Sequence, residues 1–144
     1  MAICLWKFKG RVHIIVINME KLDTKEEFSL VKRAKSFSYA GRGIVVFIKT
    51  TPNAWIHLLI LVVAVGLGMY FGITKTEWLI LVLTAGLVLT AEALNTAFEI
   101  DIDLTSPTYH PYARDVKDVA AGAVLISAIM ALIVGLIIFV PYLV

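Results

Sequence analysis

The sequence predicts an all-α membrane protein, with an N-terminal amphipathic helix at the membrane surface followed by three transmembrane helices. Of its 144 residues, 60% are apolar and only 17% are charged, whereas a soluble domain has about 45–50% apolar and about 25% charged residues. The mean hydropathy is correspondingly high, at +0.88. A single cysteine, Cys4, supports neither an intrachain disulfide nor a cysteine metal site. The net charge of +2 is too small to indicate a nucleic-acid partner.

Three apolar segments are each long enough to cross a bilayer. The first, Trp55 to Ile73, has 19 residues without a formal charge, which is about 28 Å of helix. The second, residues 78–98, contains one charged residue, Glu92. The third, residues 119–140, contains no Asp, Glu, Lys or Arg. We therefore predict that residues 51–144 form a three-helix transmembrane domain with these spans.

The basic residues predict the orientation of the spans. Seven Lys and Arg lie between Lys21 and Lys49, only Lys75 lies between the first two spans, and two more lie in the loop before the third. Because positive charges favour the cytoplasmic side, we expect the N-terminus and residues 101–118 to be cytoplasmic.

Residues 19–50 are predicted to form the surface helix. From Leu30 to Ile48, apolar residues recur at steps of three or four with basic residues mostly between them. This pattern is typical of a helix in the lipid interface, although a helix that packs on the bundle has the same pattern. Residues 1–18 precede Met19, a more natural start, and we expect them to be an extension of little functional weight.

The second span carries a stripe of polar residues. On a helix, Asn95, Thr96, Glu99 and Asp103 share with Glu92 an arc about 100° wide. A charged residue in a membrane helix is costly and therefore indicates function. Such carboxylates suit Mg²⁺ held together with substrate phosphates, or a general base. A proton or ion pathway, or simple hydrogen bonding between packed helices, fits the stripe as well.

The loop before the third span adds groups of opposite charge. Arg114 and Lys117 could donate to phosphate oxygens, or only anchor the loop at the cytoplasmic side. The third span itself has a small residue at every fourth position from Ala123 to Gly135, which indicates close helix packing. The sequence has no glycine-rich phosphate loop of the soluble type, so a nucleotide would need another architecture.

Several motifs together resemble the prokaryotic diacylglycerol kinase and undecaprenol kinase family. They are EALNTAFE at 92–99 with Asp103 after it, His110-Pro111, KDVAAGAV at 117–124, residues 36–43, and Asn53 with His57. The resemblance covers about residues 30–141 without an obvious gap. The form of residues 110–124 looks closer to the polyprenol-kinase branch.

The resemblance implies a multi-pass lipid kinase of the bacterial inner membrane, working as a homotrimer with active sites shared between chains. It would transfer the γ-phosphate of ATP, with Mg²⁺, to diacylglycerol or undecaprenol at the cytoplasmic leaflet. By motif, Glu92 is implied as the catalytic base and Glu99 as a metal ligand, with Asp103 and Asn53 in support. The implied nucleotide-binding residues are Lys32, Tyr39, Asn95, Thr108, Tyr109, His110, Lys117 and Asp118.

One position departs from the family pattern. The family has a glutamate, resembling a second metal ligand, two residues before the position of Asn53, and this chain has Thr51 there. A hydroxyl is a weaker, uncharged ligand, so Mg²⁺ could be held by Glu99, nucleotide phosphates and water. Two alternatives remain at this stage, namely a non-catalytic membrane member of the family and a small proton or ion channel.

Overall fold

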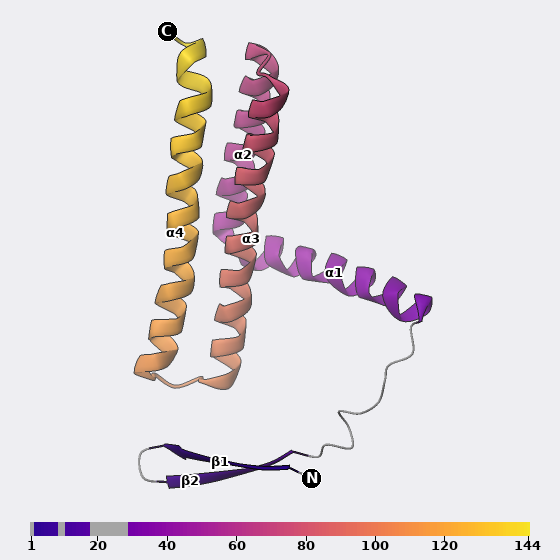
Figure 1. Ribbon diagram of the computed structural model, residues 1–144, viewed down its shortest axis with the longest axis vertical. Helices are drawn as coiled ribbons and strands as arrows, with labels where there is room; N and C mark the ends of the chain where they lie inside the picture. Colours follow the sequence, from indigo (N-terminus) through magenta and orange to yellow (C-terminus); the bar gives the residue numbers. More distant parts are fainter. Residues whose placement is uncertain (1, 9–10, 18–28) are drawn as a thin grey trace. The chain divides into compact units, whose positions relative to one another are not determined.

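A computed structural model describes residues 2–8, 11–17 and 29–144, the first two ranges by their backbone alone. The elements in chain order are β1 (Ala2–Phe8), β2 (Arg11–Ile17), α1 (Leu30–Thr50), α2 (Pro52–Phe71), α3 (Lys75–Thr105), α4 (Pro111–Phe139) and the short 3-10 helix η2 (Val140–Tyr142) (Figure 1). The chain forms two compact units, Met1–Ser38 and Tyr39–Val144.

The first unit contains a β-hairpin, to which our sequence analysis assigns no secondary structure. β1 and β2 pair antiparallel, with Ala2 opposite Ile17 and Phe8 opposite Arg11. Two residues separate the strands in the sequence, which is the commonest length for a hairpin connection. The run of valine and isoleucine in β2 favours a strand, and this composition is the signal for the hairpin. The predicted boundary at Met19 lies outside the described residues.

Helix α1 matches the apolar periodicity seen in the sequence. It has 21 residues, and none of them is buried. Most of its apolar side chains, including Phe37 and Ile44, are exposed, whereas Phe47 and Ile48 are half-buried. A helix with an apolar and a basic side is typical of a lipid interface. Its position at the membrane surface stays a prediction.

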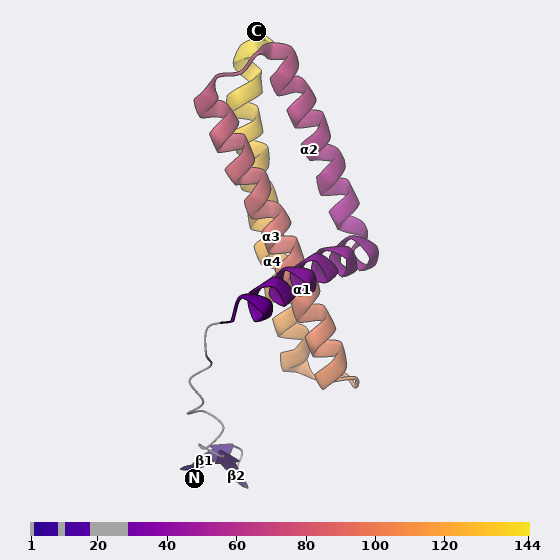
Figure 2. The same ribbon diagram turned by 90° about the vertical axis from the view of Figure 1, so that its right-hand side faces the viewer.

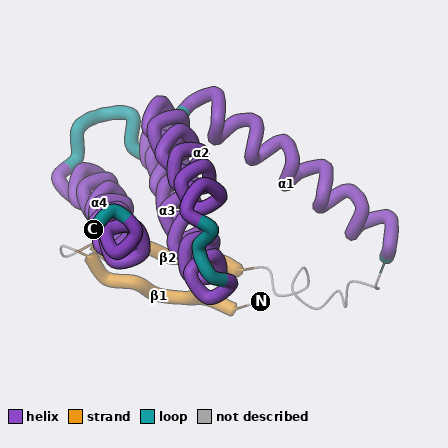
Figure 3. Tube along the Cα trace, turned by 90° about the horizontal axis from the view of Figure 1, so that it is seen from above, coloured by secondary structure: helices purple, strands orange, loops and turns teal. Residues whose placement is uncertain are grey.

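In the described part of the chain, α2, α3 and α4 are the helices long and apolar enough to cross a membrane, which confirms the predicted number of transmembrane helices. α3 packs mainly against α4, and the two run antiparallel in both side views (Figures 1 and 2). Seen from above, the three helices are nearly end-on (Figure 3). α3 and α4 continue beyond the level at which α2 begins (Figures 1 and 2), because α3 extends from Lys75 to Thr105 as one helix. The whole polar stripe therefore lies on α3.

The hydrophobic core lies where α2, α3 and the end of α4 meet. Its buried members are Ile73, Leu81 and Ile138. α2 ends at Gly72, whose φ of 65° is left-handed and suits glycine. Nearby, Gly68 allows a close approach, because a Cβ there would lie 2.9 Å from the Trp78 ring.

The same end of the bundle is fixed by hydrogen bonds. Thr74 caps α3 in a capping box with Glu77, in which the Thr74 backbone N–H donates to Glu77 Oε2 at 2.7 Å. The hydroxyl of Tyr142, just beyond α4, donates to the same carboxylate oxygen at 3.0 Å. These contacts join the turn between α2 and α3 to η2, at the end of the bundle opposite to the one that carries most of the polar stripe.

Candidate functional site

Glu92 lies at the centre of the buried polar cluster on α3. Its side chain is only 1% exposed and is the largest fully buried one among the described residues. Its Oε1 atom has no hydrogen-bond partner in the described part of the chain. A buried polar atom without a partner costs about 1–3 kcal/mol, so native proteins rarely keep one without a reason. This oxygen is therefore an unsatisfied hydrogen-bond acceptor inside the described helix packing.

Asn95 and Glu99 follow Glu92 along the same face. The Asn95 amide nitrogen Nδ2 donates to Glu99 Oε1 at 3.0 Å, and this bond fixes the orientation of the amide. Its oxygen Oδ1 is consequently left buried and without a partner among the described residues. Glu99 itself is exposed. The stripe thus changes from a buried carboxylate to an exposed one within two helical turns, with an unpartnered amide oxygen between them.

The start of α2 contacts this cluster through two threonines. The hydroxyls of Thr51 and Thr96 lie 2.7 Å apart and are buried. Thr96 Oγ1 in turn donates to the backbone carbonyl oxygen of Glu92 at 3.0 Å. The sequence places Thr96 on the stripe and suggests only a weak metal ligand at Thr51. It does not predict this contact between the two helices.

One ion pair connects the end of α3 to the start of α4, and a second lies within α4. Lys117 Nζ donates to Asp103 Oδ1 across the two helices. Arg114 Nε pairs with Asp118 Oδ2 at 3.3 Å on α4. Lys117 and Asp118, which the sequence predicts to bind a nucleotide, are therefore each paired with a neighbouring charge.

The connecting loop holds the next predicted residues. His110 is the N-cap of α4, where its Nδ1 accepts from the Tyr112 backbone N–H at 3.3 Å. Its ring also lies 5.6 Å from that of Tyr112. Thr108 and Tyr109 are exposed beside it. Their side chains are accessible to a ligand from the solvent at this end of the helix pair.

Three predicted residues lie on the first two helices. Asn53 is exposed in the first turn of α2, two residues after Thr51. Tyr39 is exposed on the part of α1 that belongs to the second unit, and Lys32 lies on the part that belongs to the first. The structure thus brings Glu92, Asn95 and Glu99 together, and the roles of Asn53, Tyr39 and Lys32 stay predictions.

The donor set on α3 fits a partly hydrated cation rather than a full protein cage. Within the described part of the chain, no three His, Cys, Asp or Glu side chains cluster as metal ligands. One carboxylate, Glu99, and one unpartnered amide oxygen, Asn95 Oδ1, lie on neighbouring turns. Mg²⁺ is usually bound by one or two carboxylates together with substrate phosphates and water. Of the two, only the exposed Glu99 carboxylate is open to a metal from solvent, because Asn95 Oδ1 is buried and the Asn95 amide presents its nitrogen to Glu99.

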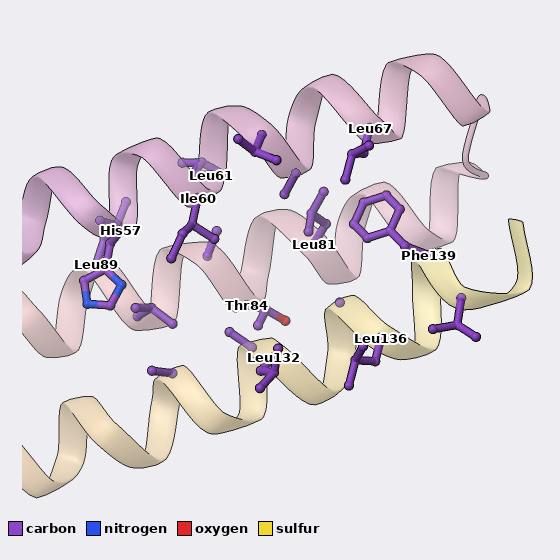
Figure 4. A pocket seen from close by; sticks show the side chains of 18 of the residues that line it. His57, Ile60, Leu61, Leu67, Leu81, Thr84, Leu89, Leu132, Leu136 and Phe139 are labelled. Carbon is purple, nitrogen blue, oxygen red and sulfur yellow. The ribbon is translucent and has the colours of Figure 1, made fainter. Parts of the chain in front are cut away.

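An apolar cavity of about 400 Å³ lies between α2, α3 and α4. His57 and Thr84 are the polar side chains that line it, and the remaining lining is apolar (Figure 4). Leu89, which lines the cavity near His57 (Figure 4), lies one turn before Glu92 on α3. From there the lining extends to Leu143 at the other end. The lining of this apolar cavity thus includes the residue one turn before Glu92 but not Glu92 itself.

Comparison with known proteins identifies the class that this fold and cluster define. Residues 38–139 match the prokaryotic diacylglycerol kinase family. Because this match covers most of the chain, the protein belongs to that family and is a multi-pass membrane lipid kinase, as the sequence motifs indicate. The assignment as an enzyme is thereby confirmed, in preference to a channel.

Individual relatives bear kinase names. The chain is 37% identical over 121 residues to the undecaprenol kinase of Bacillus subtilis, covering 83% of this chain and 98% of the relative. It is 41% identical over 101 residues to a diacylglycerol kinase of Synechocystis, covering 69% of this chain and 58% of the relative. A diacylglycerol kinase of Helicobacter pylori is 27% identical over 110 residues, covering 72% of this chain and 86% of the relative. No solved structure matches the chain.

Proposed function

We propose that the protein transfers the γ-phosphate of ATP, with Mg²⁺, to the hydroxyl of a membrane lipid alcohol at the cytoplasmic leaflet of the bacterial inner membrane. The observation that carries the proposal is the buried, unpartnered Oε1 of Glu92, one helical turn after Leu89 in the lining of an apolar cavity. Diacylglycerol and undecaprenol are the candidate substrates. Alignment over 98% of a relative named undecaprenol kinase favours undecaprenol.

Glu92 acts as the general base in this proposal. A lipid hydroxyl that enters from the cavity end would donate to Oε1, which would then take the proton as the oxygen attacks phosphorus. A base within hydrogen-bond distance of the reacting hydroxyl typically contributes about 10²–10⁴-fold to the rate. The burial of Glu92 also keeps water away from the position of the hydroxyl, which supports transfer to lipid over hydrolysis of ATP.

Glu99 and Asn95 would hold the magnesium nucleotide. The exposed position of Glu99 suits a ligand that arrives from the cytoplasm, and Asn95 Oδ1 lacks any other partner among the described residues. Bound Mg²⁺ would neutralise charge on the phosphates during transfer. Lys117 would exchange its contact with Asp103 for a phosphate oxygen, with Asp118 and the residues 108–110 completing the nucleotide site.

The arrangement in the membrane is part of the same proposal. The distribution of basic residues supports a cytoplasmic N-terminus and a cytoplasmic loop between α3 and α4, and the absence of buried residues on α1 supports a position of this helix in the headgroup region. We further propose a homotrimer. The small residues of α4, from Ala123 to Gly135, support close packing of helices.

Phosphate transfer by the purified full-length protein tests the proposal. Labelled ATP and Mg²⁺ are supplied with diacylglycerol in one set of micelles and undecaprenol in another. We expect labelled lipid with at least one alcohol and faster labelling of undecaprenol. The Glu92→Gln variant serves as the control for contaminating kinases. If folded protein labels neither lipid under conditions in which an added reference kinase does, the proposed reaction is wrong.

A further inference from the structure

We propose that Thr51 is a positioning residue that holds the Glu92 segment in place through Thr96, and that it is not a ligand of the metal. The inference rests on the proposed function, because Glu92 is the base there. It concerns the position at which this chain departs from its family, and it follows from the hydrogen bonds and burial of the residues where α2 meets α3.

Thr51 occupies the N-cap position of α2 without capping that helix. Its backbone is extended, with φ −112° and ψ 99°, but its side chain makes no capping hydrogen bond. A threonine at this position ordinarily accepts from a backbone N–H of the first turn. Here the hydroxyl lies 2.7 Å from Thr96 Oγ1 on α3. The Thr51 side chain therefore contacts α3 and makes no capping hydrogen bond in α2.

The direction of the two hydrogen bonds can be assigned from the number of protons. A threonine hydroxyl has a single proton, and that of Thr96 is donated to the Glu92 carbonyl oxygen at 3.0 Å. Thr51 must then be the donor in its contact with Thr96. The result is a directed chain from Thr51 through Thr96 to the backbone of Glu92, which connects the start of α2 to the helical turn that carries the base.

The Thr51 side chain is buried, whereas the Glu99 carboxylate is exposed. Thr51 is 8% exposed, and Ala54, three residues later on the same face of α2, is completely buried. The Glu99 oxygen Oε1 already accepts from Asn95, not from Thr51. The Thr51 side chain therefore lies on the packed face of α2 and contacts the deep part of the stripe, where it can affect the position of Glu92.

Four variants of the full-length protein test the inference. Thr51→Val removes the hydroxyl but keeps the branched shape, Thr51→Ser keeps the hydroxyl, and Thr96→Val and the double variant test whether the two residues act together. For each we would measure kcat, the Mg²⁺ concentration at half-maximal rate, and Mn²⁺ binding in the presence of a non-hydrolysable ATP analogue, followed by electron paramagnetic resonance.

Thr51→Val should lower kcat by about tenfold, the effect expected for one lost buried hydrogen bond. The half-saturating Mg²⁺ concentration and Mn²⁺ binding should remain within about twofold of the wild type, because no ligand is lost. Thr51→Ser should retain nearly full activity. The double variant should be no slower than Thr96→Val alone, since both changes interrupt the same chain.

A metal-ligand role predicts a different pattern and would overturn the inference. Thr51→Val would then weaken Mn²⁺ binding several-fold and recover its rate at high Mg²⁺, and its effect would multiply with that of Thr96→Val. Wild-type kcat in Thr51→Val would also overturn it. If Thr51→Val does not fold, Thr51→Ala replaces it in the same comparisons. A wild-type protein without transfer to either lipid refutes the proposed function itself, whereas variant effects in an active protein bear on Thr51 alone.

Discussion

Glu92→Gln is the sharpest perturbation of the proposed mechanism. The change keeps the size and polarity of the side chain but removes its ability to take a proton. Because general-base catalysis typically contributes about 10²–10⁴-fold, kcat for lipid phosphorylation should fall by about that factor. The KM for ATP should change little, since Glu92 is buried and the nucleotide residues lie toward the exposed end of the stripe. Initial rates with labelled ATP and saturating lipid measure the effect.

The same substitution should leave the fold almost equally stable. A neutral amide excludes the charged form of the side chain, which costs about 2.5–3.5 kcal/mol on insertion scales for an Asp in a membrane helix. The new amide group, however, introduces buried N–H donors without partners, at a cost of about 1–3 kcal/mol. These terms nearly offset, so the free energy of unfolding should stay within about 2 kcal/mol of the wild type. Unfolding in mixed detergent micelles, followed by circular dichroism, measures it.

Asp101→Asn is the matched control for Glu92→Gln. Asp101 is another carboxylate on α3, but it is exposed and lies outside the polar stripe. Its neutralisation should leave kcat unchanged. A Glu92→Gln variant that is folded and retains more than about a tenth of the wild-type turnover would refute the role of Glu92 as the base.

Three further variants test, one each, the binding of Mg²⁺, the binding of the lipid and the stability of the fold. Glu99→Gln should raise the half-saturating Mg²⁺ concentration about tenfold or more, because the metal loses its carboxylate ligand; an unchanged magnesium titration would contradict this. Gly135→Leu extends a side chain into the cavity and should raise the KM for the lipid by a few fold. The effect is small because a lipid chain that enters the cavity leaves hydrocarbon and not water. Gly66→Leu is the control and should not change this KM, because Gly66 lies outside the cavity lining and a side chain there meets open space. Tyr142→Phe removes the hydrogen bond to Glu77 and should lower the free energy of unfolding slightly without changing kcat; reduced turnover would show that this end of the bundle affects catalysis.

Hydropathy predicts the membrane spans because each one must satisfy its backbone hydrogen bonds internally while exposing apolar side chains to lipid. The predicted second span ends at residue 98, but α3 continues to Thr105. Hydropathy marks where a helix leaves the apolar phase and not where its hydrogen bonding stops. The hairpin Ala2–Ile17 is missed for a different reason, since its two short strands depend on pairing with each other and not on a long periodic pattern.

Positions along one helix follow from the sequence, whereas contacts between helices do not. Helical geometry alone places Glu92, Asn95 and Glu99 on one face. It gives no information on which residue of α2 lies opposite Thr96, because this depends on the crossing of two helices. The Lys117–Asp103 pair is similarly set by the antiparallel packing of α3 and α4 across the connecting loop.

The contact between Thr51 and Thr96 changes how a missing family carboxylate is interpreted. From the sequence alone, a hydroxyl in place of a metal-binding glutamate suggests a weakened or inactive relative. In the structure that hydroxyl is buried and lies 2.7 Å from the Thr96 hydroxyl, which donates to the Glu92 backbone carbonyl oxygen, while Glu99 is the exposed carboxylate of the stripe. Because Mg²⁺ commonly takes most of its ligands from phosphates and water, one protein carboxylate is sufficient in principle. The substitution is therefore compatible with catalysis, at the expense of a stronger dependence of metal binding on the nucleotide.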